Sequence, residues 1–207
     1  MFRRECYVDL TTKVRNLRVI QGYAPTTAHS DVEYEEFLEQ ISRALSARFH
    51  YQNSAVPRKK RKLSKIVGGD FNAKIGSGEE NEKFIEKYGL GIRNKRGEIL
   101  ANFCSESELY VMNNRFKKRR SRKWTWILPN MQTKNAIDFV LSTDQSIFSD
   151  VDIMGRFKFV SDHRFVMAKI RIQSKHHRYP RAVRTTTNIN ESVFAAALEC
   201  LVSDRVP

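Results

Sequence analysis

Residues 65–76 read KIVGGDFNAKIG, an apolar run followed by two glycines and an Asp-x-Asn sequence. β-Branched residues that lead into glycine are typical of a strand entering a tight turn. We therefore predict a strand over 63–67 and a glycine-rich turn that places Asp70 and Asn72 at its end. Taken alone, the same letters are equally consistent with an Asx-type turn that has no chemical role.

Strand and helix patterns alternate on both sides of this stretch. A strand is predicted over 17–23, and the helix after it begins with a Ser30-x-x-Glu33 capping box and continues with apolar residues at helical spacing. Further periodic segments predict a helix near 99–104, strands at 109–112, 136–141 and 166–172, and a polar loop over 77–97 with one helical turn near 82–88. This alternation indicates an α/β fold.

The 207 residues carry 37 basic and 23 acidic side chains, a net charge of +14. This surplus favours an anionic partner, and nucleic acid is the leading candidate. No apolar run approaches the ~18 residues of a membrane span. The N-terminus lacks the apolar core of a secretory signal, so we expect a nuclear or cytoplasmic, non-secreted monomer.

The character of the chain changes near residue 173. We predict one domain over 1–172, followed by a basic linker and one short helix over 173–207. No internal repeat is visible, and the three cysteines are too far apart in sequence to suggest a zinc site.

Several polar residues lie within or beside predicted strands, where strand ends in an α/β protein can converge on one rim. They are Tyr23, Asp70, Asn72, Asp138, Asp162 and His163. Three carboxylates, an amide and an imidazole would suit Mg²⁺ or Mn²⁺ and phosphodiester chemistry. Simpler interpretations remain for single residues: a strand aromatic for Tyr23, a solvent-facing Asp138 and an exposed turn for Asp162-His163.

The order of these motifs resembles the endonuclease/exonuclease/phosphatase superfamily, which includes DNase I. Within it, the sequence is most similar to the endonuclease domain of non-LTR, RTE-like retrotransposons and to their craniofacial-development-protein-like relatives. The resemblance covers roughly residues 14–172 and is carried by VIQGYAPTT (19–27), KIVGGDFNAKIG (65–76), KWTWILPNMQTKNAIDFVLS (123–142) and VSDHRFVMAKI (160–170). It implies a mixed two-sheet β-sandwich flanked by helices.

The resemblance also implies a role for each residue of the set. Asp70 and Asn72 would orient or activate the attacking water and contact the phosphate, and Tyr23 would donate to the phosphate. Asp162 would bind the metal, and His163 would act as base or transition-state stabiliser while Asp138 orients it. Trp126 lies where the family often has an aromatic residue; core packing is its expected role, and base stacking is the alternative.

The family pattern starts earlier, with one strand that ends in asparagine and another that ends in a metal-binding glutamate. Nothing before Tyr23 matches either, and the spacing of Glu5 and Asp9 does not suit the glutamate motif. We therefore expect an N-terminally incomplete domain that is a poor nuclease or none. Two alternatives are a binding protein without turnover and, more weakly, a phosphatase for small or lipid phosphates.

Two basic runs interrupt the predicted elements. Their members are Arg58, Lys59, Lys60, Arg61 and Lys62 in the first run, and Lys117, Lys118, Arg119, Arg120, Arg122 and Lys123 in the second. Solvated loops are the simple interpretation. The alternative is contact with the phosphate backbone of a nucleic acid near the predicted metal site, and we expect DNA rather than RNA.

Overall fold

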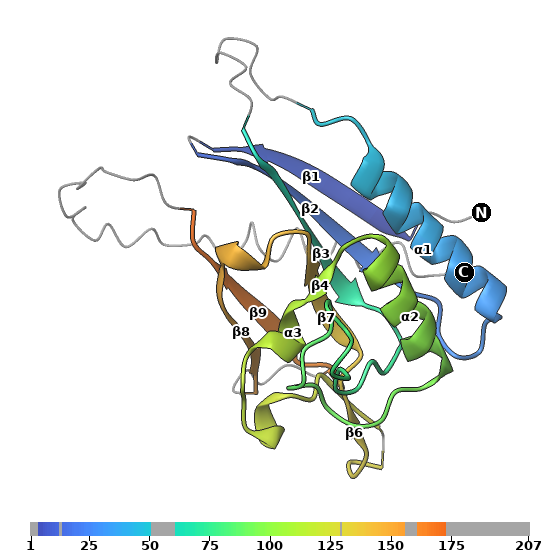
Figure 1. Cartoon of the computed structure of the whole chain (residues 1–207). Coiled ribbons are helices and arrows are strands. Elements are labelled where there is room, and N and C mark those ends of the chain that lie inside the picture. Colours follow the sequence, from blue (N-terminus) through green and yellow to red (C-terminus); the bar gives the residue numbers. More distant parts are fainter. Residues whose placement is uncertain (1–3, 13, 51–60, 129, 156–160, 173–207) are drawn as a thin grey trace, which may run out of the picture. The chain divides into compact units, whose positions relative to one another are not determined.

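The computed structural model describes residues 4–12, 14–50, 61–128, 130–155 and 161–172 (Figure 1). The predicted linker and helix over 173–207, and the first basic residues Arg58, Lys59 and Lys60, lie outside the described residues. No helix in the described part combines the length and the apolar character needed to cross a membrane.

Five strands form the main sheet, in the order β1-β2-β3-β7-β4. Their bounds are β1 Glu5–Thr11, β2 Asn16–Tyr23, β3 Leu63–Asp70, β4 Tyr110–Val111 and β7 Asp138–Ser142. β2 and β3 are parallel, and the other neighbours are antiparallel. A parallel pair needs a crossover connection, and helix α1 (Asp31–Ser46) supplies it.

Helix α1 begins as its sequence predicts. The Ser30 hydroxyl accepts a hydrogen bond from the Glu33 backbone N–H, and the Glu33 carboxylate accepts one from the Ser30 N–H. The predicted apolar residues of this helix are all buried: Tyr34, Phe37, Leu38, Ile41 and Leu45. The capping box and the amphipathic pattern are confirmed.

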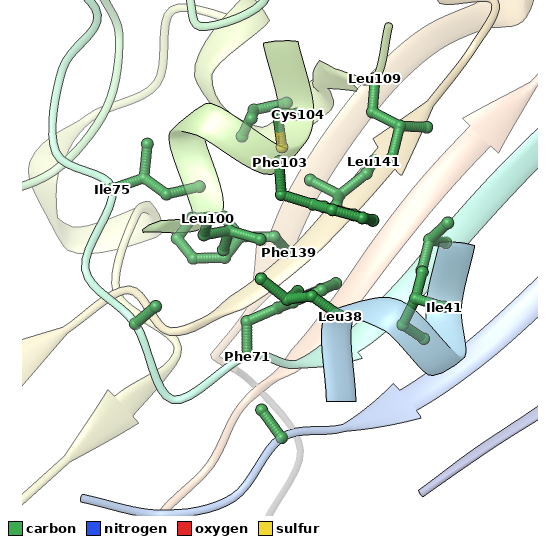
Figure 2. Packing of buried hydrophobic residues seen from close by; sticks show 14 of the residues in the cluster. Leu38, Ile41, Phe71, Ile75, Leu100, Phe103, Cys104, Leu109, Phe139 and Leu141 are labelled. Atoms are coloured by element: carbon green, nitrogen blue, oxygen red, sulfur yellow. The ribbon is translucent and has the colours of Figure 1, made fainter. Parts of the chain in front are cut away.

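One face of the sheet packs against α1 and α2 (Lys95–Glu106). Figure 2 shows Phe71 and Phe139 from the strand ends meeting Leu38 of α1 and Leu100 and Phe103 of α2. This cluster contains most of the buried apolar side chains of the described residues and fills the space between the sheet and the two helices.

The opposite face packs against a second sheet of two strands, β8 (Phe148–Met154) and β9 (Phe165–Ile170). Leu17, Ile66 and Val140 from the large sheet form a second cluster with Phe148 and Val151 of β8. Smaller elements complete the described chain: α3 Met112–Arg115, β5 Trp126–Ile127, β6 Lys134–Asn135, and two 3₁₀ turns at Arg120–Arg122 and Gln145–Ile147. The mixed α/β architecture with stacked sheets is confirmed.

Several local predictions were wrong. The strand predicted over 63–67 continues through both glycines to Asp70, because Gly68 and Gly69 pair with β2 and β7 in register. The helical turn predicted near 82–88 is turn and bend, and only Tyr110–Val111 of the predicted strand 109–112 is extended. Strands β1 and β8 were not predicted at all.

Candidate active site

Three of the predicted residues form one row across the large sheet. Tyr23 pairs with Asp70, and Asp70 pairs with Asp138, at the ends of β2, β3 and β7. Side chains alternate along a strand, and Phe139 packs into the cluster under the helices. Asp138 and its neighbours in the row therefore project from the opposite face, which carries β8 and β9.

Asn72 is tied directly to Asp70. Its backbone N–H donates to Asp70 Oδ1 at 2.8 Å, and its side-chain amide donates to Asp70 Oδ2 at 3.3 Å and to the Ala24 carbonyl at 2.9 Å. Asn72 has a φ of +46°, in the left-handed region that asparagine tolerates. The Asx-type contact proposed as the simple interpretation is thus present, and it fixes the Asp70 carboxylate.

His163 faces Asp138. Its Nδ1 lies 3.1 Å and 3.3 Å from the two carboxylate oxygens, and since an ionised carboxylate only accepts, Nδ1 is the donor. Hydrogen bonding to Asp138 is the main reason why the pKa of His163 is raised above its ordinary value. The pair therefore stabilises the imidazolium and directs Nε2 away from Asp138.

Asp70, Asp138 and His163 form the metal-binding candidate of the described residues, with one ligand atom from each lying within 4.8 Å of the others. Burial is the main reason why the pKa of Asp70 is raised to about 6, with nearby Asp138 and Asp162 adding to the effect. Two clustered carboxylates provide the oxygen ligands that Mg²⁺ and Mn²⁺ prefer. The donor set therefore fits a hard divalent cation.

Asp162, whose role as a metal ligand stays a prediction, lies outside the three-residue cluster. It is exposed, and its Oδ2 accepts a hydrogen bond from the Trp126 indole at 2.7 Å. Trp126 is only half-buried, so its expected core role is wrong: it orients Asp162 instead. Tyr23 stands at the end of the row with 49% of its surface exposed.

Two residues that the sequence analysis missed hold Asp138 in place. The buried Thr125 hydroxyl accepts hydrogen bonds from the Ile137 and Asp138 N–H groups at 3.0 and 3.1 Å. The Asn113 amide donates to the Asp138 carbonyl at 3.1 Å and accepts from the Val140 N–H at 2.8 Å. Both residues are polar and lie beside predicted strands, which was the signal available in the sequence. The neighbouring residues gave no indication that Asp138 is their partner.

The described part of the first basic run, Arg61 and Lys62, does not flank this site. Lys62 forms an ion pair with Asp144 at 2.9 Å, next to the start of β3. Asp70 ends the same strand, roughly 25 Å away at the usual rise per residue. The predicted nearness to the metal site is therefore wrong for Lys62, because the intervening strand is extended.

The second basic run is partly used inside the fold. Lys118 forms an ion pair with Asp150 at 2.6 Å, Arg122 pairs with Asp152, and Lys123 donates to the Gly89 carbonyl at 3.3 Å. Lys117, Arg119 and Arg120 are exposed. Of this run, those three side chains are the best placed for contact with a polyanion.

Replacing Asp138 by asparagine is expected to lower the pKa of His163, because the carboxylate is its main stabilising partner. A titration of the His163 ring protons by NMR measures the change in the metal-free chain. His29, which is exposed and is not a member of the cluster, serves as the internal reference for the ring signals. An unchanged His163 pKa would contradict the geometry described above.

Replacing Asp70 by asparagine is expected to stabilise the metal-free chain at pH 8 by about 1–3 kcal/mol. A folded-state pKa of about 6, above the unfolded value, makes ionised Asp70 destabilising, so its contribution to stability falls as pH rises from about 4 to 6. Urea unfolding at pH 4 and pH 8 tests this. The gain should be confined to the higher pH.

Comparisons with known proteins show the family of the chain and the likeness of its fold. A family model described as endonuclease-reverse transcriptase matches residues 17–167. Craniofacial development protein 2 of Tragulus javanicus is 28% identical over 180 residues, covering 86% of this chain and 29% of that protein. The Bos taurus protein of the same name is 30% identical over 163 residues, covering 77% and 25%. The chain thus spans less than a third of either relative.

Among solved structures, the fold is similar to the endonuclease domain of TRAS1, a telomere-specific non-LTR retrotransposon. The TM-score is 0.54 at 19% identity, and the match covers 83% of this chain and 63% of that domain. At this identity the likeness concerns the fold alone.

Proposed function

Because the chain belongs to the endonuclease-reverse transcriptase family, within the DNase I-like endonuclease/exonuclease/phosphatase superfamily, we propose that it is a metal-dependent phosphodiesterase that cleaves DNA. The observation that carries this proposal is the cluster of Asp70, Asp138 and His163, in which a half-buried carboxylate lies close to a carboxylate–imidazole pair. Phosphodiester hydrolysis needs a base for water and positive charge for the phosphate.

The two pKa shifts favour a division of roles. In the metal-free chain the pKa of Asp70 is about 6, so its carboxylate is ionised at neutral pH and can either accept a proton from water or bind a cation. His163, whose pKa is raised, suits the cationic role of stabilising charge on the phosphate. Asn72 donates hydrogen bonds to Asp70 and so orients its carboxylate, and Tyr23 and Asn72 would contact the phosphate.

Asp70 and Asp138 would hold a Mg²⁺ or Mn²⁺ ion, with Asp162 close enough along the chain to His163 to contribute. When bound, such an ion neutralises phosphate charge and increases the acidity of water. The exposed Lys117, Arg119 and Arg120 would contact the DNA backbone without reading its sequence.

Nicking of supercoiled plasmid DNA by the purified full chain tests the proposal. We expect cleavage that requires Mn²⁺ or Mg²⁺, stops with EDTA and falls at least about 100-fold in His163→Ala. His29→Ala, which removes an exposed histidine outside the cluster, should retain activity. Asp162→Ala should lose activity as well, and cleavage that survives both site variants would show a contaminating nuclease.

A second candidate is a DNA-binding protein without turnover. It is favoured by the small number of ligands in the cluster found among the described residues. This cluster holds two carboxylates, both from aspartates, and no glutamate. Salt-dependent binding of DNA by a chain that nicks nothing at any metal concentration would establish this alternative.

A further inference from the structure

The start of helix α2 contacts the segments that leave both β2 and β3. Asn94, which caps this helix, accepts hydrogen bonds from the Gly97 N–H at 2.8 Å and the Lys74 N–H at 3.0 Å, and its own N–H donates to the Lys74 carbonyl. A Cβ at Gly97 would lie 1.9 Å from the Lys74 carbonyl oxygen. The helix start therefore packs against the segment that carries Asn72.

Arg96 makes the corresponding contact with the segment after β2. Only 5% of this residue is exposed, and its guanidinium donates to the carbonyls of Pro25 at 2.8 Å and His29 at 2.6 Å. It also bonds Asp31 at 3.3 Å and lies 5.0 Å from the centre of the Tyr34 ring. One buried side chain thus connects both ends of this segment, at Pro25 and His29, to the start of α2.

That segment continues directly into the candidate active site. Ala24, next to Pro25, accepts the Asn72 side-chain amide at 2.9 Å, and its N–H donates to the Asp70 carbonyl at 2.8 Å. Asn72 in turn donates twice to the Asp70 carboxylate. A shift of residues 24–25 would therefore remove a partner of the amide that orients Asp70.

We propose that Arg96 is a positioning residue: through Pro25 and Ala24 it fixes the Asn72 amide and hence the orientation of the Asp70 carboxylate. The effect on catalysis rests on the proposed function, whereas the effect on Asn72 does not. Lysine cannot replace arginine here, because a single ammonium group cannot reproduce the planar fork that reaches carbonyls of separate residues.

Arg18 provides a matched control for a purely structural role. It is fully buried and donates to three carbonyls beyond the middle of α1, those of Ala44, Ala47 and Arg48. Arg18 lies in β2, five residues before Tyr23. Its hydrogen bonds to the described residues include none to residues 24–30. Arg18→Lys should therefore weaken the fold without altering Asn72.

The experiment compares Arg96→Lys with Arg18→Lys in the full chain. NMR of the Asn72 side-chain amide, without metal or DNA, should show a large shift in Arg96→Lys and none in Arg18→Lys. If the chain nicks DNA, kcat should fall about 10- to 100-fold in Arg96→Lys, with KM little changed. Arg18→Lys should keep the kcat of its folded fraction.

The outcomes separate the two proposals. A wild-type chain without nicking would defeat the proposed function, while the Asn72 shift would still test the role of Arg96. An Asn72 signal that is unchanged in Arg96→Lys, or that moves equally in both variants, would overturn that role. If Arg96→Lys does not fold, Arg96→Gln, which retains an N–H donor without the charge, is measured in the same way.

Discussion

Alanine at position 69 is expected to lower the free energy of unfolding by more than about 4 kcal/mol, whereas alanine at position 68 should change it by less than about 1 kcal/mol. A Cβ on Gly69 would lie 1.9 Å from the Gly22 carbonyl oxygen, a backbone atom of the paired strand, and its φ of +148° disfavours any side chain. A Cβ on Gly68 has Gln21 Oε1 as its nearest neighbour, at an ordinary 3.6 Å.

Urea unfolding of the two variants measures the difference. Each exchanges one glycine for alanine in the same strand, so the loss of backbone freedom in the unfolded chain is the same for both. Similar urea midpoints for the two variants would contradict the prediction, because they would mean that β2 and β3 are not as close at Gly22 and Gly69 as described. Because Gly69 precedes Asp70, the same substitution should also disturb the cluster with Asp138 and His163.

Asparagine at position 9 is expected to lower the free energy of unfolding by about 3–5 kcal/mol, the usual cost of leaving a buried charge without its partner. Asp9 is 5% exposed and accepts two hydrogen bonds, at 2.7 and 2.8 Å, from Arg18, which is fully buried. It also accepts the His50 N–H at 2.7 Å, so the pair connects β1, β2 and the segment after α1.

Thermal and urea unfolding at pH 7 test this, with Lys95→Ala as the control. Lys95 forms an ion pair with Asp31, but its side chain is 81% exposed, so its removal should leave the midpoint unchanged. Burial raises the pKa of Asp9, but the bonds from Arg18 and His50 outweigh it, and the pKa is lowered overall. The stabilisation by Asp9 should therefore be lost as pH falls below about 4.

The site shows how far motif order predicts geometry. Asp70, Asn72, Asp138 and His163 were each ambiguous as single residues, yet the structure brings all four together. Asp162 and Trp126 show the limit: neither the hydrogen bond between the indole and the carboxylate nor the half-buried position of Trp126 was predicted. The positions of side chains at strand ends follow from the pairing of the strands. Contacts between a loop and a short strand, such as that of Asp162 with Trp126, depend on packing that no local sequence pattern encodes.

The amino-acid sequence by itself determined the class of the fold, the amphipathic helix α1 with its capping box, the strand that carries Asp138, and the first part of the strand that ends at Asp70. These features follow from local periodicity and short-range hydrogen bonds, which adjacent residues specify. It also determined the family, because the motifs occur in a recognisable order.

Only the tertiary structure decided which of two adjacent glycines is indispensable, which buried aspartate pairs with Arg18, and which lysines lie far from the site. It also decided that Thr125, Asn113 and Arg96 support the catalytic candidates. The physical reason is common to all of them: each depends on a partner from another strand or helix, and strand register and helix packing set those distances.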